Sequence, residues 1–147
     1  MEALYPYAQI IHLILAIIFL GYVFTDLAVI SALKNRFDKD TQKKITQILG
    51  ARSFKIFPIT LLFLVLTGGM MMSRFMNLDV GFFESDLQKM LLFKILLVFI
   101  IVAGVLSNLF KKFTKREKSK FMKDDFHKLV IVLGVFIVVF AKLMFFV

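Results

Sequence analysis

The stretch that decides the fold is residues 10–33, which read IIHLILAIIFLGYVFTDLAVISAL. About 20 consecutive apolar residues cross the hydrocarbon core of a bilayer as an α-helix, so this stretch is long enough to span a membrane. Its two ionisable residues, His12 and Asp26, lie fourteen positions apart, which is nearly four whole helical turns. Both side chains therefore project from one stripe of one helix, near its opposite ends. Ionisable groups inside a span are costly and usually face a bundle interior, a cavity or a ligand.

Three further apolar stretches follow, and together the four predict spans at about residues 8–33, 55–76, 87–110 and 126–147. The chain of 147 residues is 60% hydrophobic, with a mean hydropathy of +0.87. Soluble domains are nearer to about 45–50% apolar, so the excess apolar surface is expected to face a lipid bilayer. We therefore predict an all-α integral membrane protein that forms a single four-helix transmembrane bundle. Gly68, Gly69 and Gly104 offer close-packing faces and favour a homo-oligomer.

Basic residues predict the orientation of the bundle. Residues 34–55 carry seven Lys/Arg and residues 111–128 carry eight, whereas residues 73–89 carry two. By the positive-inside rule, the basic loops 34–54 and 111–125 are cytoplasmic, so both termini face outward. This N-out and C-out arrangement predicts a multi-pass protein of a bacterial inner membrane, with both termini in the periplasm. Because the basic residues fall between apolar spans, topology explains the net charge of +9, and no nucleic-acid partner is predicted.

Local signals near the second span concern Asp40 and Pro58. Asp40 is predicted to cap a short helix, which would either lie along the membrane surface or extend the second span into the cytosol. Pro58 is predicted in the first turn of the second span, where proline costs little. The chain has no cysteine, which excludes disulfides, Cys-ligated metals, iron–sulfur clusters and thiol nucleophiles.

The predicted orientation gathers one group of side chains in the outer half of the bundle: His12, Met70, Met71, Met72, Arg74, Lys94 and Lys142. Lys94 lies deep in the third span without a carboxylate at its level, which favours an anionic partner or an altered protonation state. Lys142 lies near the interface and can snorkel. The methionines are consecutive and point in three directions, so at most one or two of them can face one site. His12 can alternatively be a structural histidine that bonds a carbonyl on a neighbouring helix.

A sparser inner layer holds Asp26, Asn108 and His127. Asp26 is predicted to bond Asn108 or His127, or to reach the inner interface. His12 and His127 lie near opposite faces of the membrane, roughly 20 Å or more apart by the helical rise. One haem held by both histidines of a single chain is therefore not expected.

The outer layer is chemically suited to a porphyrin. His12 is a candidate ligand of haem iron, with a methionine such as Met71, or no protein group, on the other side. Arg74, Lys94 and Lys142 can pair with the carboxylates of the macrocycle.

Two other uses of the same residues stay open. His12 with Met70 or Met71 would make a copper site, because imidazole and thioether groups are ligands of soft metals. The chain would otherwise be a non-catalytic assembly or scaffold subunit, in which the polar residues only fix the register of the helices.

Four positions form a pattern: His12 within IIHLILAIIFLG, Thr67-Gly68 late in the second span, Arg74 just beyond it, and Lys94 within QKMLLFK. The pattern resembles the superfamily that contains the HemJ-type protoporphyrinogen oxidases and the CopD copper-resistance membrane domain. The resemblance implies haem b as cofactor and His12 as its ligand. It also implies that Arg74 and Lys94 are catalytic residues that contact tetrapyrrole carboxylates.

The chain departs from the HemJ-type pattern at two places. Met90 stands where those chains usually carry a tryptophan, and Thr25-Asp26-Leu27 replaces a Pro-Arg-Leu type of sequence. We expect a haem- or porphyrin-binding membrane redox protein with its ligand in the periplasmic half and a membrane electron-transfer partner. A CopD-like copper-handling protein is the alternative.

Overall fold

The computed structural model describes residues 2–76, 81–114, 125–143 and 146, and these residues form helices joined by turns, with no strand among them. Within them, η1 is a short 3-10 helix and η2 is a π-helical segment. The elements, in chain order, are η1 (Glu2–Leu4), α1 (Tyr5–Thr25), η2 (Asp26–Ile30), α2 (Ser31–Lys34), α3 (Lys39–Met72), α4 (Asp86–Phe113) and α6 (Phe126–Leu143).

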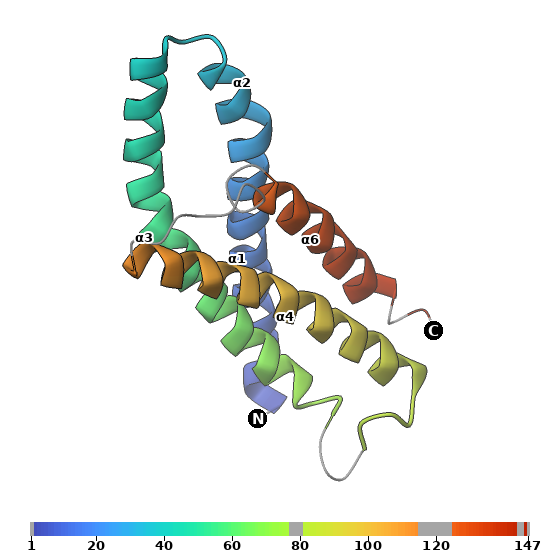
Figure 1. Ribbon diagram of the computed structural model, residues 1–147. Helices are drawn as coiled ribbons and strands as arrows, with labels where there is room; N and C mark the ends of the chain where they lie inside the picture. The colour runs from blue at the N-terminus through green and yellow to red at the C-terminus, as the bar shows by residue number, and fades with distance from the viewer. Residues whose placement is uncertain (1, 77–80, 115–124, 144–145, 147) are drawn as a thin grey trace.

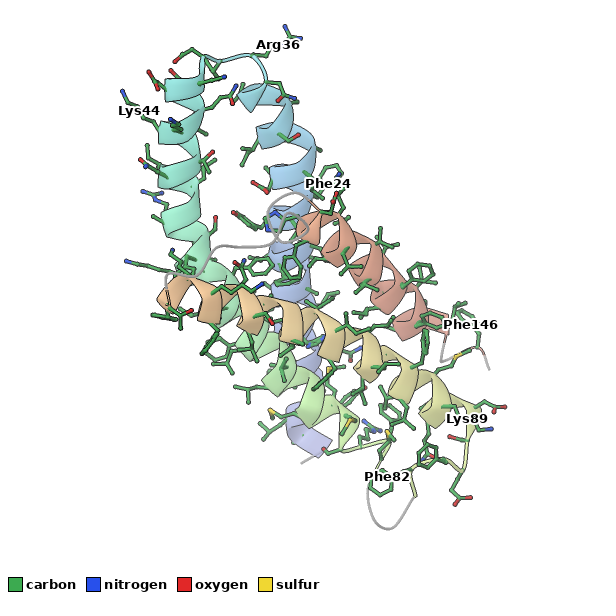
Figure 2. All side chains as sticks on the ribbon, viewed as in Figure 1. Phe24, Arg36, Lys44, Phe82, Lys89 and Phe146 are labelled. Carbon is green, nitrogen blue, oxygen red and sulfur yellow. The ribbon has the colours of Figure 1, made fainter. Side chains whose placement is uncertain are left out.

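Four helical stretches are long and apolar enough to cross a membrane: Tyr5–Leu33, Lys39–Met72, Asp86–Phe113 and Phe126–Leu143. The prediction of an all-helical chain with four membrane-length helices is confirmed. Side chains project outward along all of these helices (Figure 2), and many of the exposed ones are large and apolar, which suits contact with lipid. Part of the second predicted loop, residues 115–124, and residues 144, 145 and 147 of the fourth predicted span lie outside the described residues.

α3 is one continuous helix that starts well before the predicted second span. Most of the first basic connection therefore extends this helix instead of forming a separate one. The predicted cap, Asp40, is wrong by two residues. Asp38 is the N-cap, and its carboxylate accepts hydrogen bonds from the backbone N–H groups of Asp40 and Thr41, both at 3.1 Å. Hydrogen bonds from Thr41 hold the pKa of the Asp38 carboxyl below its ordinary value.

Pro58 lies in the interior of α3, and the prediction that it occupies a first turn is wrong because the helix begins at Lys39. An interior proline removes the hydrogen bond to the carbonyl four residues earlier, here that of Phe54, and its ring crowds that carbonyl. Sharp bends in helices usually occur at such residues. Figure 1 shows α3 changing direction near its middle, so that its two halves point differently.

The helices pack as two antiparallel pairs, α1 with α3 and α4 with α6 (Figure 1). The ring of Phe126 in α6 lies against Gly104 in α4, where any Cβ would collide with it. Gly104 therefore provides a close contact inside the chain. The main buried cluster draws on all four long helices: Phe19, Val23, Leu61, Ile101, Val105, Phe126 and Val130.

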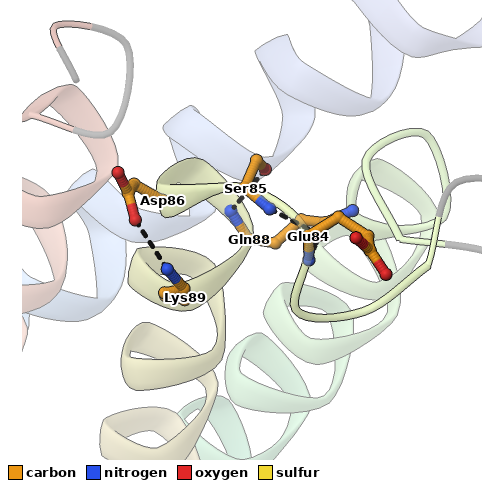
Figure 3. Close-up of polar contacts among 5 residues, drawn as sticks. All are labelled: Glu84, Ser85, Asp86, Gln88 and Lys89. Carbon is orange, nitrogen blue, oxygen red and sulfur yellow. Dashed lines mark hydrogen bonds and ion pairs between the residues drawn. The ribbon is translucent and has the colours of Figure 1, made fainter.

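Gln88 holds the connection between α3 and α4 (Figure 3). Its side chain is 2% exposed, and with Ser85 it forms a capping box at the start of α4. The Gln88 Oε1 atom accepts from the backbone N–H groups of Glu84 (2.7 Å) and Ser85 (3.2 Å). Its Nε2 group donates to the carbonyls of Phe75 (3.0 Å) and Gly81 (3.1 Å). One buried amide thus satisfies four backbone groups of the connection.

We expect Gln88→Ala to lower the free energy of unfolding by roughly 2 kcal/mol or more, because each buried polar group left without a partner costs about 1–3 kcal/mol. Thermal melting of the detergent-solubilised protein, followed by circular dichroism, measures the effect. Lys89→Ala is the control, since its ion pair with Asp86 (2.8 Å) is exposed and is worth about 1 kcal/mol at most. Equal melting temperatures for the two variants would contradict the role given to Gln88.

Candidate functional site

A cavity of about 290 Å³ lies between α1, α3, α4 and α6, and we call it the His12 cavity. Among the described residues, His12 and Lys94 are the only ones on its lining with polar side chains. The remaining described walls are aliphatic, aromatic or thioether side chains and three glycines. The cavity therefore combines one imidazole and one lysine with apolar surroundings.

The orientation of the His12 ring is set by Thr67 on α3. The His12 Nδ1 atom lies 2.8 Å from Thr67 Oγ1, and the Thr67 hydroxyl donates to the carbonyl of Phe63 at 2.7 Å. A hydroxyl has a single proton, so Thr67 accepts the second hydrogen bond from Nδ1–H of His12. In the neutral imidazole, Nε2 then carries the lone pair. The carbonyl of Leu64, also on α3, makes a backbone hydrogen bond with His12, in agreement with the alternative prediction of a bond to a carbonyl on a neighbouring helix.

The glycines that follow Thr67 have different roles. A Cβ on Gly68 would lie 3.2 Å from Cε1 of His12, so the absence of a side chain there gives the ring its place. A Cβ on Gly69 would have no described atom within 4 Å, and Gly69 lines the cavity. Thr67 therefore provides a hydrogen-bond acceptor and Gly68 leaves room for the imidazole. Gly69 forms a part of the cavity wall that carries no side chain.

Lys94 on α4 reaches the same cavity from the opposite helix pair and is half-buried. It makes no hydrogen bond or ion pair with any residue that the structure describes. Burying an ammonium group without a partner is costly. An anionic group of a ligand would remove that cost.

The other predicted site residues do not line the His12 cavity. The guanidinium of Arg74 lies 4.7 Å from the centre of the Tyr5 ring, and the ammonium of Lys142 lies 5.8 Å from that of Phe146. Of the three consecutive methionines, Met72 lines the cavity, whereas Met70 and Met71 do not. The sequence contains no signal that selects Met72, because the choice depends on the rotation of α3 against its neighbours.

A second cavity of about 650 Å³ contains all three residues of the predicted inner layer, and we call it the Asp26 cavity. Asp26 Oδ2 lies 2.6 Å from Nδ1 of His127, which confirms one of the two predicted partners. Asn108 lies on the same wall, and its Oδ1 atom is buried without a hydrogen-bond partner among the described residues. Of the residues that the structure describes, none lines both cavities.

The four helices that are long and apolar enough to cross a lipid bilayer indicate the class of a multi-pass helical membrane protein. Within the described ranges, no group of three or more His, Asp or Glu side chains is arranged to hold a metal ion. Comparisons of the chain with family models, curated proteins and solved structures find no match.

We expect the tautomer of His12 to be less fixed in Thr67→Val. Valine keeps the shape of threonine but lacks the hydroxyl that accepts from Nδ1–H. Nitrogen-15 NMR of histidine-labelled protein measures this as a change from one protonated Nδ1 to a mixture of tautomers. Thr60→Val is the matched control, since the Thr60 hydroxyl donates to the carbonyl of Ile56 within α3 at 2.9 Å. A His12 spectrum that is the same in wild type and Thr67→Val would refute the assignment.

Proposed function

We propose that the chain is a haem- or porphyrin-binding membrane redox protein of the HemJ type, with its ligand in the His12 cavity. The observation that supports this best is the pairing of two groups across one apolar cavity. His12 presents an unprotonated Nε2 atom, and Lys94 has no partner among the described residues. The imidazole nitrogen of His12 could bind haem iron, and the ammonium of Lys94 could pair with a propionate.

The residues present fit such a group in two further respects. A metal-binding histidine usually donates its other ring N–H to an oxygen, which fixes the ring, and Thr67 provides that oxygen. Gly69 and the aliphatic walls suit a flat apolar macrocycle, and the Met72 side chain lies on the same lining. The volume of about 290 Å³ lies just below the range of about 300–1,000 Å³ for ligand sites, so a whole porphyrin would need more space than this cavity provides.

When bound, haem supplies one-electron chemistry, and the protein positions and tunes it. In this proposal, His12 would hold the iron and Lys94 would pair with a carboxylate of the tetrapyrrole. Arg74 stays a predicted catalytic residue, and it would have to leave the ring of Tyr5, on which it stacks, to reach the ligand. The site lies in the periplasmic half of a bacterial inner membrane protein whose termini both face outward.

Copper handling is the second candidate, and one observation favours it. Met72 and His12 line the same cavity, so a thioether and an imidazole lone pair are available to one soft metal ion. This pairing uses Met72 in place of the predicted Met70 or Met71.

We expect purified wild-type protein to show a Soret band, either as isolated or after haem is added, and His12→Ala to abolish it because iron loses its protein ligand. Absorption spectroscopy of the detergent-solubilised protein measures the band. His127→Ala is the matched control and should keep it, since His127 lines the other cavity. Lys94→Met should weaken haem binding about tenfold, as a hydrogen bond to a charged group is worth about 1.5–3 kcal/mol.

A wild-type protein without a Soret band, even with added haem, would refute the haem proposal. Stoichiometric copper that is lost in Met72→Leu would then support the copper site. Binding of neither haem nor copper would leave a scaffold subunit.

The proposed orientation predicts opposite labelling of two single-cysteine variants, and the natural chain gives no background because it lacks cysteine. A membrane-impermeant maleimide added to intact spheroplasts should label Glu84→Cys, in the connection of low positive charge, but not Lys43→Cys. Permeabilisation should expose Lys43→Cys to the reagent. The reverse pattern would show that the termini face the cytoplasm.

A further inference from the structure

The Asp26 cavity differs from the His12 cavity in being lined by many polar groups. Its walls come from α1, η2, α3, α4 and α6, and its volume of about 650 Å³ lies within the range of about 300–1,000 Å³ for small-molecule sites. We propose that it binds a neutral, flat ring of the quinone–quinol class, whose oxygen atoms bond Asn108 and the Asp26–His127 pair. This inference concerns binding and does not rest on the proposed function of the His12 cavity.

The Asp26–His127 pair can present either a donor or an acceptor to such a ring. With Asp26 Oδ2 at 2.6 Å, Nδ1 of His127 is held as the N–H that donates to the carboxylate. Nε2 is then a lone pair in the neutral imidazole and an N–H in the protonated one. In the neutral imidazole, Nε2 can accept from a quinol hydroxyl. In the protonated imidazole, Nε2–H can donate to a quinone carbonyl. The side chains of His127 and Asp26 are 34% and 21% exposed, so the pair is accessible.

Asn108 supplies the second polar contact. Its Oδ1 atom is buried and has no hydrogen-bond partner among the described residues, although a buried acceptor left alone is costly. A ring hydroxyl would satisfy this oxygen, and a ring carbonyl would bond the amide nitrogen instead. The amide and the imidazole come from α4 and α6, so one ring can meet groups from two helices.

The charge balance of the lining favours a neutral ligand over an anion. Apart from His127, the described lining residues include one acidic side chain, Asp26, and one basic side chain, Lys112. The Lys112 ammonium also lies over the ring of Phe54, with 3.4 Å to its centre. The Tyr22 hydroxyl donates to Ser53, whose own hydroxyl donates to the carbonyl of Leu49 at 2.6 Å. Tyr22 therefore keeps its oxygen as a further acceptor.

Aromatic side chains supply faces and edges for a flat ring. Phe54, Phe57 and Phe126 all line the cavity, and the rings of Phe57 and Phe126 lie 6.2 Å and 6.3 Å from the ring of His127. A conjugated ring bound in the cavity would have these aromatic rings as neighbours, in offset or edge-on arrangements. An alkyl chain without a ring could not form hydrogen bonds with the polar groups that line the same cavity.

Two irregular parts of the helices lie at this cavity. The π-helical segment begins at Asp26, and Pro58, which interrupts the hydrogen bonding of α3, lines the cavity. π-Helical turns are rare and occur often at functional sites. Two separate departures from regular helix geometry therefore lie where the polar groups meet.

The test is a titration of the full chain in nanodiscs with a benzoquinone that carries a decyl tail, and with its hydroquinone. Calorimetry measures affinity, and nitrogen-15 NMR follows the His127 ring and the Asn108 amide. The chain has no cysteine that the quinone could alkylate. We expect saturable binding, shifted His127 and Asn108 signals, and about tenfold weaker binding of the hydroquinone in Asn108→Leu, because one hydrogen bond to a buried group is lost.

Two controls distinguish binding in the Asp26 cavity from binding in the His12 cavity and from partitioning of the tail into lipid. Lys94→Met should bind the quinone as wild type does, since Lys94 lines the His12 cavity, so a failure of the haem proposal would leave this result unchanged. Decanol has a similar tail without the ring and should not shift the His127 signals. Absence of saturable binding overturns the proposal. Unmoved His127 and Asn108 signals in folded wild-type protein would also overturn it, as would equal shifts with decanol.

Discussion

Hydrocarbon offers no hydrogen bonds, and this constraint governs the polar side chains of the whole chain. Gln88 satisfies four backbone groups, Thr67 bonds His12, and Asp26 bonds His127, so each of these polar side chains has a partner inside the protein. Among the described half-buried side chains that line the two cavities, two depart from the rule: Lys94 has no partner, and the Oδ1 atom of Asn108 has none. Each of these lies in a different cavity, so the places where the rule is broken coincide with the places where a ligand is expected.

The core cluster separates these two cavities. Phe19, Leu61 and Ile101 belong to the cluster and also line the His12 cavity, whereas Val105 and Phe126 line the Asp26 cavity. Apolar side chains from four helices thus form a layer between an imidazole–lysine site and a carboxylate–imidazole site. Separate sites are consistent with the sequence argument that His12 and His127 are too far apart to share one ligand.

The sequence was sufficient for features that depend on one helix at a time. Four spans follow from apolar runs, and the spacing of His12 and Asp26 along one span already predicts two polar levels. Features that depend on how helices meet were not predictable. Met72, and neither Met70 nor Met71, lines the His12 cavity because of the rotation of α3. The capping box of Ser85 and Gln88 was readable from its spacing, but the reach of Gln88 back to Phe75 and Gly81 required the folded connection.

The contact between Gly104 and Phe126 has a consequence for geometry beyond packing. The ring of Phe126 occupies the space that a side chain at Gly104 would fill. Helices α4 and α6 therefore cannot slide or rotate against each other without moving this ring out of its place. Asn108 follows Gly104 by one helical turn, and His127 is the next residue after Phe126. The contact between Gly104 and Phe126 therefore fixes the distance between the amide of Asn108 and the imidazole of His127.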